Sequence, residues 1–200
     1  MSNLLDAYRH GIFPWFSDED PILWWSPDPR MVMFPSEIRI PRSLRKASRA
    51  TKFEVTADRV FTQVISACRI PRDGQPGTWI TEEMATAYAA LHEAGYAHSL
   101  ETWIDGELAG GLYGVAIGRA FFGESMFTRV DNASKFALVA LAHQLDAWDF
   151  GLIDCQMRTD HLAMFGAREI PRADFAQRLS ELVNYSDVSG RWEIEIDTVL

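Results

Sequence analysis

Two carboxylates and one amide lie in stretches of the sequence that are typical of buried strands. Glu124 sits inside the apolar run AFFGESMF at residues 120–127, and Asp154 and Gln156 lie in LIDCQM at residues 152–157. Burying a carboxylate is costly unless it is paired or hydrogen-bonded. Such residues therefore either hold a polar network together or take part in catalysis, where carboxylates accept and donate protons. If the two strands are neighbours, the three side chains form one candidate site.

The composition is that of a globular protein and limits its function. The chain has 200 residues, of which 48% are hydrophobic and 24% charged, enough for one sizeable domain or one domain with a small appendage. No apolar run approaches the ~18–20 residues of a membrane span, and the N-terminus has no signal-like pattern. Two cysteines are too few for a disulfide framework. We therefore expect a cytoplasmic protein without a membrane partner.

The metal-binding residue types form no recognisable motif. The five histidines are scattered, with no HxH or HxxxH pair, and the two cysteines are isolated from them. A zinc site is usually built from closely spaced ligands of these types. We expect no metal site and no cofactor.

The charge is unevenly distributed along the chain. The net charge of −9 argues against indiscriminate nucleic-acid binding. Residues 39–52 nevertheless contain six basic residues and no acidic one, and four of them have the spacing of one helix face: Arg42, Arg45, Lys46 and Arg49. This face is either an ordinary solvated surface or a local phosphate-binding patch on an acidic protein.

The first 35 residues are rich in aromatic residues and proline. Three prolines between residues 21 and 29 exclude a regular helix there. Trp15, Trp24 and Trp25 lie in this segment and must pack on something, because tryptophan is costly to leave in water. The ordinary interpretation is an irregular layer over the core. The alternative is a stacking wall for a flat ligand such as a nucleobase.

The remaining pattern predicts an ordered series of elements. A helix at 55–67, after a short strand, precedes a Pro/Gly loop at 69–78, and Thr81 then caps a helix that ends at Gly95. Strands at 97–104 and 107–117 flank an Asp105-Gly106 turn, and a third strand follows at 119–124. The later elements are a long helix ending at residue 148, a strand at 152–157, helices at 160–165 and 173–183, and a strand at 191–196.

A three-stranded meander, a helix, a parallel-type strand and a short helix form the layout of the acyl-CoA N-acyltransferase superfamily. We therefore expect an α+β, GNAT-like catalytic domain at 53–200 after a small N-terminal segment at 1–52. Coenzyme A binders of this layout hold the pyrophosphate on a Gly-rich loop between the third strand and the helix. Here that place reads SMFTRVDN at 125–132, without glycine. The sequence therefore predicts an acyl donor other than coenzyme A.

Several short motifs point to one family. They are GIFPW (11–15), WWSPDPR (24–30), GTWI (77–80), GESMF (123–127), NASK (132–135), IDCQ (153–156) and EIPR (169–172). In this order, from about Leu4 to Phe175, they resemble the leucyl/phenylalanyl-tRNA–protein transferase family.

The resemblance implies an enzyme that moves leucine or phenylalanine, and methionine less well, from aminoacyl-tRNA to a protein. The acceptor would be the α-amine of a protein that begins with Arg or Lys, and the product would be degraded in the bacterial N-degron pathway. Members have an N-acyltransferase-like C-terminal domain and a smaller N-terminal domain. They carry a longer segment before the GIFPW motif, so we expect a shortened N-terminal domain here. We also expect a monomer.

The resemblance also implies how the donor is bound. Trp15 and Trp79 match tryptophans that contact the 3′-terminal adenosine. The tRNA acceptor stem would lie on the basic residues Arg42, Arg45, Lys46 and Arg49. The pocket for the aminoacyl side chain would be lined by Phe121, Met126, Leu141 and Ile153, with Leu141 standing where other members have an aromatic residue.

The implied chemistry is aminolysis of an ester, with Asp154 and Gln156 matching the catalytic pair and Glu124 an acid at the reaction centre. The attacking amine must be unprotonated and must lose a further proton during the reaction. Our hypothesis is that Asp154 polarises Gln156, which holds the amine, with Asp154 as the electrostatic or proton-accepting partner. Glu124 would attract the cationic acceptor or fix the aminoacyl α-amine.

Two other functions stay open at this point. A coenzyme A-dependent N-acetyltransferase would share the layout, although the missing Gly-rich loop counts against it. A non-catalytic module that binds the tRNA acceptor end would need the basic helix and the tryptophans. It would not need Glu124, Asp154 and Gln156 together.

Overall fold

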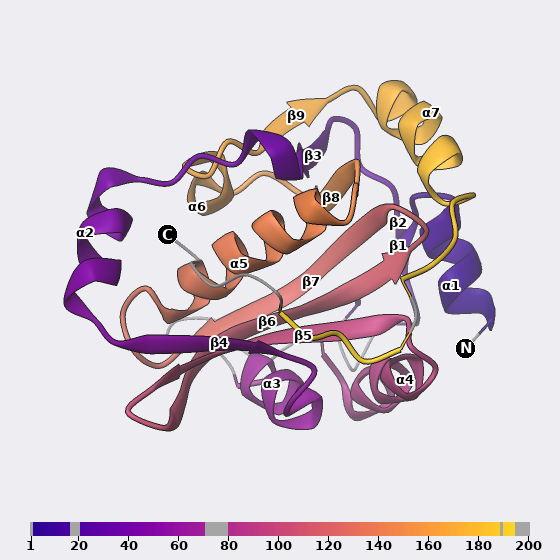
Figure 1. Ribbon diagram of the computed structural model, residues 1–200. Helices are drawn as coiled ribbons and strands as arrows, with labels where there is room; N and C mark the ends of the chain where they lie inside the picture. The colour runs from indigo at the N-terminus through magenta and orange to yellow at the C-terminus, as the bar shows by residue number, and fades with distance from the viewer. Residues whose placement is uncertain (1, 17–20, 71–79, 189, 195–200) are drawn as a thin grey trace.

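A seven-stranded mixed sheet with helices on both faces forms the body of the protein (Figure 1). The computed structural model describes residues 2–16, 21–70, 80–188 and 190–194. In spatial order the strands are β4 (Phe53–Ala57), β5 (Ala97–Ile104), β6 (Glu107–Ile117), β7 (Ala120–Thr128), β8 (Leu152–Gln156), β3 (Arg30–Met33) and β9 (Arg168–Ile170). Of the neighbouring pairs in this sheet, β7 and β8 are parallel and the others antiparallel. The α+β class is therefore confirmed.

The expected antiparallel meander is present as β5, β6 and β7. Asp105 and Gly106 turn the chain with positive φ angles of 52° and 81°, the combination that a tight hairpin matching the strand twist requires. The third strand is longer than expected, because β7 continues past residue 124 and pairs with β6 as far as Thr128 opposite Gly110. The helix and the parallel strand that follow also agree with the predicted order.

Helices cover both faces of this sheet. α5 (Ala133–Ala147) crosses one face, and α3 (Phe61–Cys68) and α4 (Glu82–Glu93) lie on the other (Figure 1). Thr81 caps α4 as predicted, accepting a hydrogen bond from the amide of Met84 at 3.2 Å. Gly95 ends this helix segment with a φ of 79°. Two hydrophobic clusters result, one on each face of the sheet.

The other helices lie around the sheet, and several elements were not predicted. α2 (Arg42–Ala50) follows the short 3₁₀ turn η1 (Pro35–Glu37), and α6 (Asp160–Ala163) and α7 (Arg172–Leu182) are close to their predicted bounds. The helix predicted from Val55 begins only at Phe61, because residues 53–57 form β4. The elements that were missed are α1 (Ser2–Arg9), the two-stranded ribbon of β1 (Phe13–Pro14) and β2 (Trp24–Trp25), and strands β3 and β9. These strands are only two to four residues long, too short for an alternating pattern to show.

The last predicted strand is wrong over its described part, because residues 191–194 form no strand. Trp192 is instead buried, its ring stacked on His98 at 3.8 Å and its amide donating to the Asp58 carboxylate at 2.8 Å. The side chain therefore anchors the segment without a strand ladder. Of the described helices, none is long and apolar enough to cross a membrane. The domain boundary expected at residue 52 stays a prediction.

Candidate active site

The candidate residues meet where the parallel strands β7 and β8 part. The two strands pair from Ala120 opposite Leu152 to Phe122 opposite Asp154. Beyond that point β7 continues along β6, while β8 ends at Gln156, paired with β3. Glu124 and Gln156 therefore stand on the two sides of the opening. The two strands are neighbours, as the sequence suggested.

Glu124 on β7 is the hub of a polar cluster whose other members come from α1, α4 and β8. One carboxylate oxygen accepts hydrogen bonds from the Tyr8 hydroxyl at 2.7 Å and from the Gln156 amide at 3.3 Å, and the other accepts from the Tyr88 hydroxyl at 2.6 Å. The two hydroxyls are also 2.7 Å apart. A register shift in the β6–β7 pair leaves Glu124 without a partner opposite it, and such a bulge re-aims a side chain.

The surroundings of Glu124 favour the protonated, neutral form of its carboxyl group more than water does. Burial raises the pKa of Glu124 to about 7, although the hydrogen bonds from Tyr88 and Tyr8 act in the opposite direction and the nearby Asp154 charge adds to the rise. Burial also raises the pKa of both tyrosines, so they remain hydrogen-bond donors. Glu124 can therefore change its charge near neutral pH.

Asp154 lies in a different environment, since it is fully buried and paired with a cation. One oxygen accepts from Arg30 Nε at 2.8 Å and the other from the Nη2 atom at 2.6 Å. Arg30 is also fully buried, and its guanidinium lies 4.9 Å from the ring centroid of Phe13 and 4.6 Å from that of Phe175. This two-point pairing fixes the Asp154 carboxylate in position.

Gln156 is held by both acids. Its backbone amide donates to Asp154 at 2.9 Å, and its side chain donates to Glu124. Its φ of 64° lies in the left-handed region, which is uncommon for a residue other than glycine and is found where surrounding contacts enforce it. Asp154 therefore fixes the backbone of Gln156, and Glu124 orients its amide.

Three members of this network were not singled out from the sequence. Arg30 ends the WWSPDPR motif and Tyr88 lies in the helix predicted after Thr81, but neither was given a role. Tyr8 lies on α1, which was not predicted. A buried acid requires hydrogen-bond donors. Hydroxyl groups on otherwise apolar helix faces were therefore the candidates that the sequence offered.

The four expected pocket residues gather on the other face of the sheet. They belong to the cluster beneath α5, where Phe121, Leu141 and Ile153 are buried and Met126 is half-buried. Phe121 and Ile153 immediately precede Phe122 and Asp154, so strand alternation turns them away from the face that carries the acids. The structure brings these four together, on the α5 side of the strand opening.

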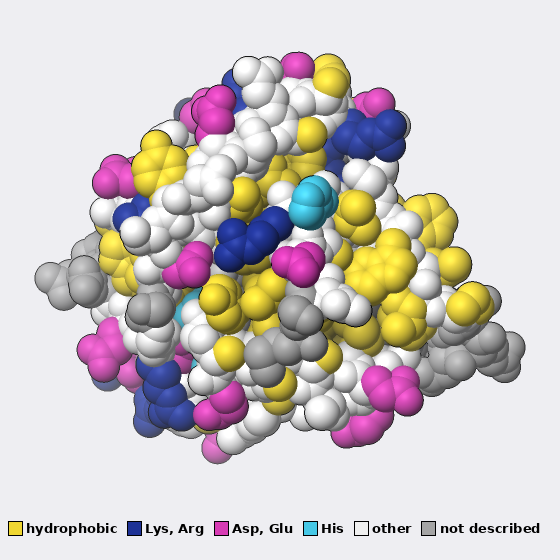
Figure 2. Space-filling view, turned by 90° about the vertical axis from the view of Figure 1, so that its right-hand side faces the viewer, with side chains coloured by type: hydrophobic (Ala, Val, Ile, Leu, Met, Phe, Trp, Pro, Cys, Tyr) yellow, Lys and Arg dark blue, Asp and Glu magenta, His cyan; other side chains and the backbone are white. Residues whose placement is uncertain are grey.

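The tryptophans of the β1–β2 ribbon are exposed, so the expectation that they cover the core is wrong. Trp15, Trp24 and Trp25 keep 40%, 46% and 44% of their surface accessible. Trp25 donates its ring N–H to the Trp15 carbonyl at 2.8 Å, and the two rings lie 6.1 Å apart. Hydrophobic side chains gather on the side of the molecule where α1, α7 and this ribbon lie (Figure 2). Trp79 lies outside the described residues.

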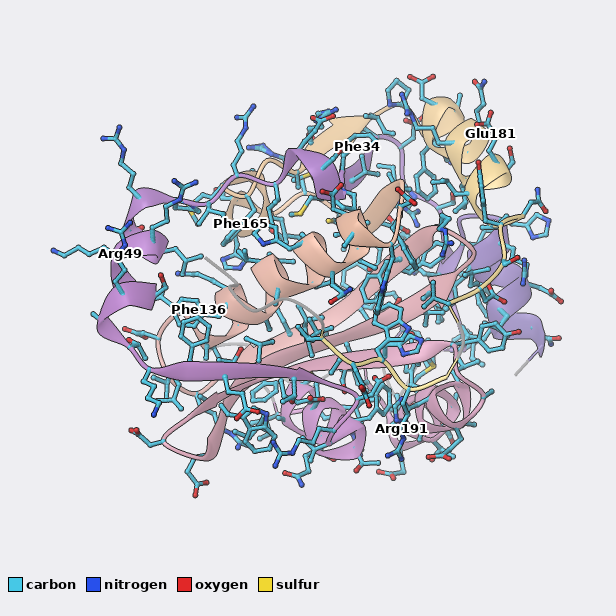
Figure 3. All side chains as sticks on the ribbon, in the orientation of Figure 1. Phe34, Arg49, Phe136, Phe165, Glu181 and Arg191 are labelled. Atoms are coloured by element: carbon cyan, nitrogen blue, oxygen red, sulfur yellow. The ribbon has the colours of Figure 1, made fainter. Side chains whose placement is uncertain are left out.

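The basic residues of α2 form one exposed face, as their spacing predicted. Leu44 points into the core, and a shallow hollow on the outer side is lined by Arg42, Arg45, Lys46, Arg49 and Ala50. Figure 3 labels Arg49 on α2, across the molecule from Glu181 on α7. The ion pairs found among the described residues do not involve these four cations.

Cys155 lies between the two site residues of β8 but faces the other way. It packs against the α5-side cluster, and burial raises the pKa of its thiol, which makes it a poor nucleophile. In the described part of the chain no group of three or more His, Cys, Asp or Glu side chains could hold a metal ion.

Comparison with known proteins identifies the family. A family model described as leucyl/phenylalanyl-tRNA protein transferase matches residues 32–180, and the model of its N-terminal domain matches residues 2–28. The chain belongs to the leucyl/phenylalanyl-tRNA–protein transferase family. The resemblance noted in the motifs is thereby confirmed, and the protein is an enzyme of the aminoacyltransferase class.

Curated relatives that match almost the whole chain carry the name leucyl/phenylalanyl-tRNA–protein transferase. The protein of Nitrosospira multiformis is 62% identical over 94% of this chain and 82% of its own length. That of Thiobacillus denitrificans is also 62% identical, over 98% of this chain and 86% of its own length. The Nitrosomonas europaea protein is 60% identical over 94% of this chain and 80% of its own length.

Proposed function

We propose that the protein transfers leucine or phenylalanine, and methionine less well, from aminoacyl-tRNA to the α-amine of proteins that begin with Arg or Lys. Family membership supports the reaction class. The observation that carries the proposal is the contact between Glu124 and Gln156 where β7 and β8 part. A partly exposed acid and amide at one opening can face both an ester and an incoming cation.

The donor tRNA is held at two places in this proposal. The 3′-terminal adenosine stacks on Trp15, together with Trp79, and base–aromatic stacking of this kind contributes ~1–3 kcal/mol per base. The acceptor stem lies along the basic face of α2, whose four exposed cations suit phosphates. The chain as a whole carries a net charge of −9. A local basic cluster is nevertheless sufficient, because only the acceptor end of the tRNA has to be bound.

The aminoacyl side chain enters the apolar region beneath α5, lined by Phe121, Met126, Leu141 and Ile153. Each methylene buried there contributes about 0.8 kcal/mol, so long apolar side chains are favoured over short ones. A polar side chain would lose its hydrogen bonds to water without replacement. This accounts for the choice of leucine, phenylalanine and methionine.

The catalytic roles follow from the network. The Arg30–Asp154 pair fixes Gln156, whose amide holds the attacking amine beside the ester carbonyl. Glu124 provides negative charge for the cationic end of the acceptor. Because an aminoacyl ester is already activated, alignment of the two substrates supplies much of the acceleration. The reaction uses no metal and no cofactor.

The fold and the setting complete the proposal. The β5–β6–β7 meander, α5 and the parallel β8 support a GNAT-like catalytic domain. The segment between β7 and α5 lacks the glycines that would hold a pyrophosphate, which supports a donor other than coenzyme A. The enzyme acts in the cytoplasm as a monomer, and its products are marked for degradation through the N-degron pathway.

One assay tests this function against the alternatives. Labelled leucine on tRNA is mixed with the protein and an Arg-initiated peptide, with an Asp-initiated peptide of otherwise identical sequence as the control. The proposal predicts label on the Arg-initiated peptide alone. Acetylation from acetyl-coenzyme A would favour the N-acetyltransferase. Binding of charged tRNA without any transfer would favour the non-catalytic module.

A further inference from the structure

The two acids of the site differ in what already occupies them. One Asp154 oxygen accepts hydrogen bonds from Arg30 Nε and from the backbone N–H of Gln156. The other accepts from the Nη2 atom of Arg30. The side chain is fully buried. A substrate amine therefore has no exposed surface of this carboxylate to approach.

Glu124 has the opposite properties. Its partners are neutral donors, two tyrosine hydroxyls and the side-chain amide of Gln156. The residue is half-buried and lies just beyond the last paired residues of β7 and β8. A carboxylate in such a place can take up a proton without losing a cationic partner.

We propose that Glu124 is the proton acceptor of the aminolysis, and that Arg30 confines Asp154 to an electrostatic, positioning role. This inference depends on the proposed transfer reaction and adds to it the path of the proton. Arg30 acts through Asp154 and Gln156 and is therefore a positioning residue, whereas Glu124 contacts the reacting amine.

The step balances without any further reactant. The neutral α-amine attacks the ester carbonyl carbon, a C–N bond forms, and the carbonyl oxygen takes the electron pair. Glu124 accepts one proton from the nitrogen. The intermediate then collapses, the bond between carbon and the ribose oxygen breaks, and that oxygen takes the proton from Glu124. The products are the amide, a free ribose hydroxyl and the regenerated carboxylate.

The surroundings of Glu124 determine the pH dependence. Tyr8 on α1, Tyr88 on α4 and Tyr113 on β6 face it, together with the Arg30–Asp154 pair of β3 and β8. With the Glu124 pKa at about 7, the active carboxylate is present above pH 7 and is lost as the pH falls below it. The transfer rate should therefore increase as the pH rises through about 7. This increase should be absent in a variant in which residue 124 cannot ionise.

The test is the pH profile of single-turnover leucine transfer to an Arg-initiated peptide by the full chain. Wild type is expected to show a limb near pH 7, that is, a rise of the transfer rate with pH. Glu124→Gln should lack this limb, and Asp154→Asn should keep it at a lower rate. Glu124→Gln should be ~10²–10⁴-fold slower, the usual contribution of a positioned base. Glu107→Gln, a charge-matched change at an exposed glutamate on β6, serves as the control. The α-amine of the acceptor peptide also titrates, near pH 8, in all variants. Repeating the profile with a less basic acceptor identifies this second transition, because only the transition that belongs to the amine then moves.

A second variant keeps the test independent of how well Glu124→Gln folds. Tyr88→Phe removes a hydrogen bond that stabilises the charged form of Glu124, so the limb should move to higher pH. A limb that persists in Glu124→Gln, that disappears in Asp154→Asn, or that does not move in Tyr88→Phe would overturn the inference. Absence of transfer by wild type at every pH would instead refute the proposed function, and the inference with it.

Discussion

Replacing Arg30 by methionine should be among the most damaging single changes in this protein. The change keeps an unbranched chain between Phe13 and Phe175 but removes two charge-assisted hydrogen bonds, of 2.8 and 2.6 Å, from a carboxylate that has no accessible surface. Breaking a fully buried pair from one side costs about 3–5 kcal/mol, because it leaves an uncompensated charge in the interior. Because ordinary domains are stable by only ~5–15 kcal/mol, a large part of the total would be lost.

The measurement is urea unfolding of wild type, Arg30→Met, Asp154→Asn and the double variant, each extrapolated to zero denaturant. The double variant should lose less free energy of unfolding than the sum of the two single variants, because it contains no stranded charge. Arg168→Met is the matched control, since it breaks an ion pair with Glu37 that is exposed, and it should change stability little. A loss below about 1 kcal/mol for Arg30→Met, or additive losses, would refute the buried pairing from which the roles of Asp154 and Gln156 were derived.

Three further outcomes follow from the site. Trp15→Ala should weaken binding of the donor's 3′ end by ~1–3 kcal/mol in a titration with aminoacyl-adenosine; unchanged affinity would remove Trp15 from the site. Changing Arg42, Arg45 and Arg49 to alanine should reduce the slope of log affinity against log salt for tRNA, and an unaltered slope would make α2 an ordinary solvated surface. Asp154→Asn should lower turnover far more than tRNA affinity, whereas equal losses in both would indicate a folding role only.

The sequence predicted the elements that local rules determine. The Asp105-Gly106 turn fixed the bounds of two strands, and Thr81 and Gly95 fixed the ends of α4. In each case the deciding residues are neighbours along the chain, so the physical cause can be seen in the sequence. The basic face of α2 followed from helical spacing for the same reason.

What the sequence could not provide was pairing between distant segments. Arg30 is 124 positions from Asp154 and comes from a strand of only four residues. Tyr8 is 116 positions from Glu124, on a helix that was not predicted. The bulge that leaves Glu124 unpaired depends on the register of β6 against β7, and Trp192 is buried by packing on His98 rather than by a strand pattern. Tertiary contacts decide all four.

The central claim is that Glu124 and Gln156 act together on one bond at the opening between β7 and β8. It is tested most directly by the single-turnover rate of leucine transfer in a cycle of Glu124→Gln, Gln156→Ala and the double variant. Groups that act as one unit are far from additive, so the double variant should be about as slow as the slower single variant. If the two losses multiply, the side chains act separately and the site described here is wrong.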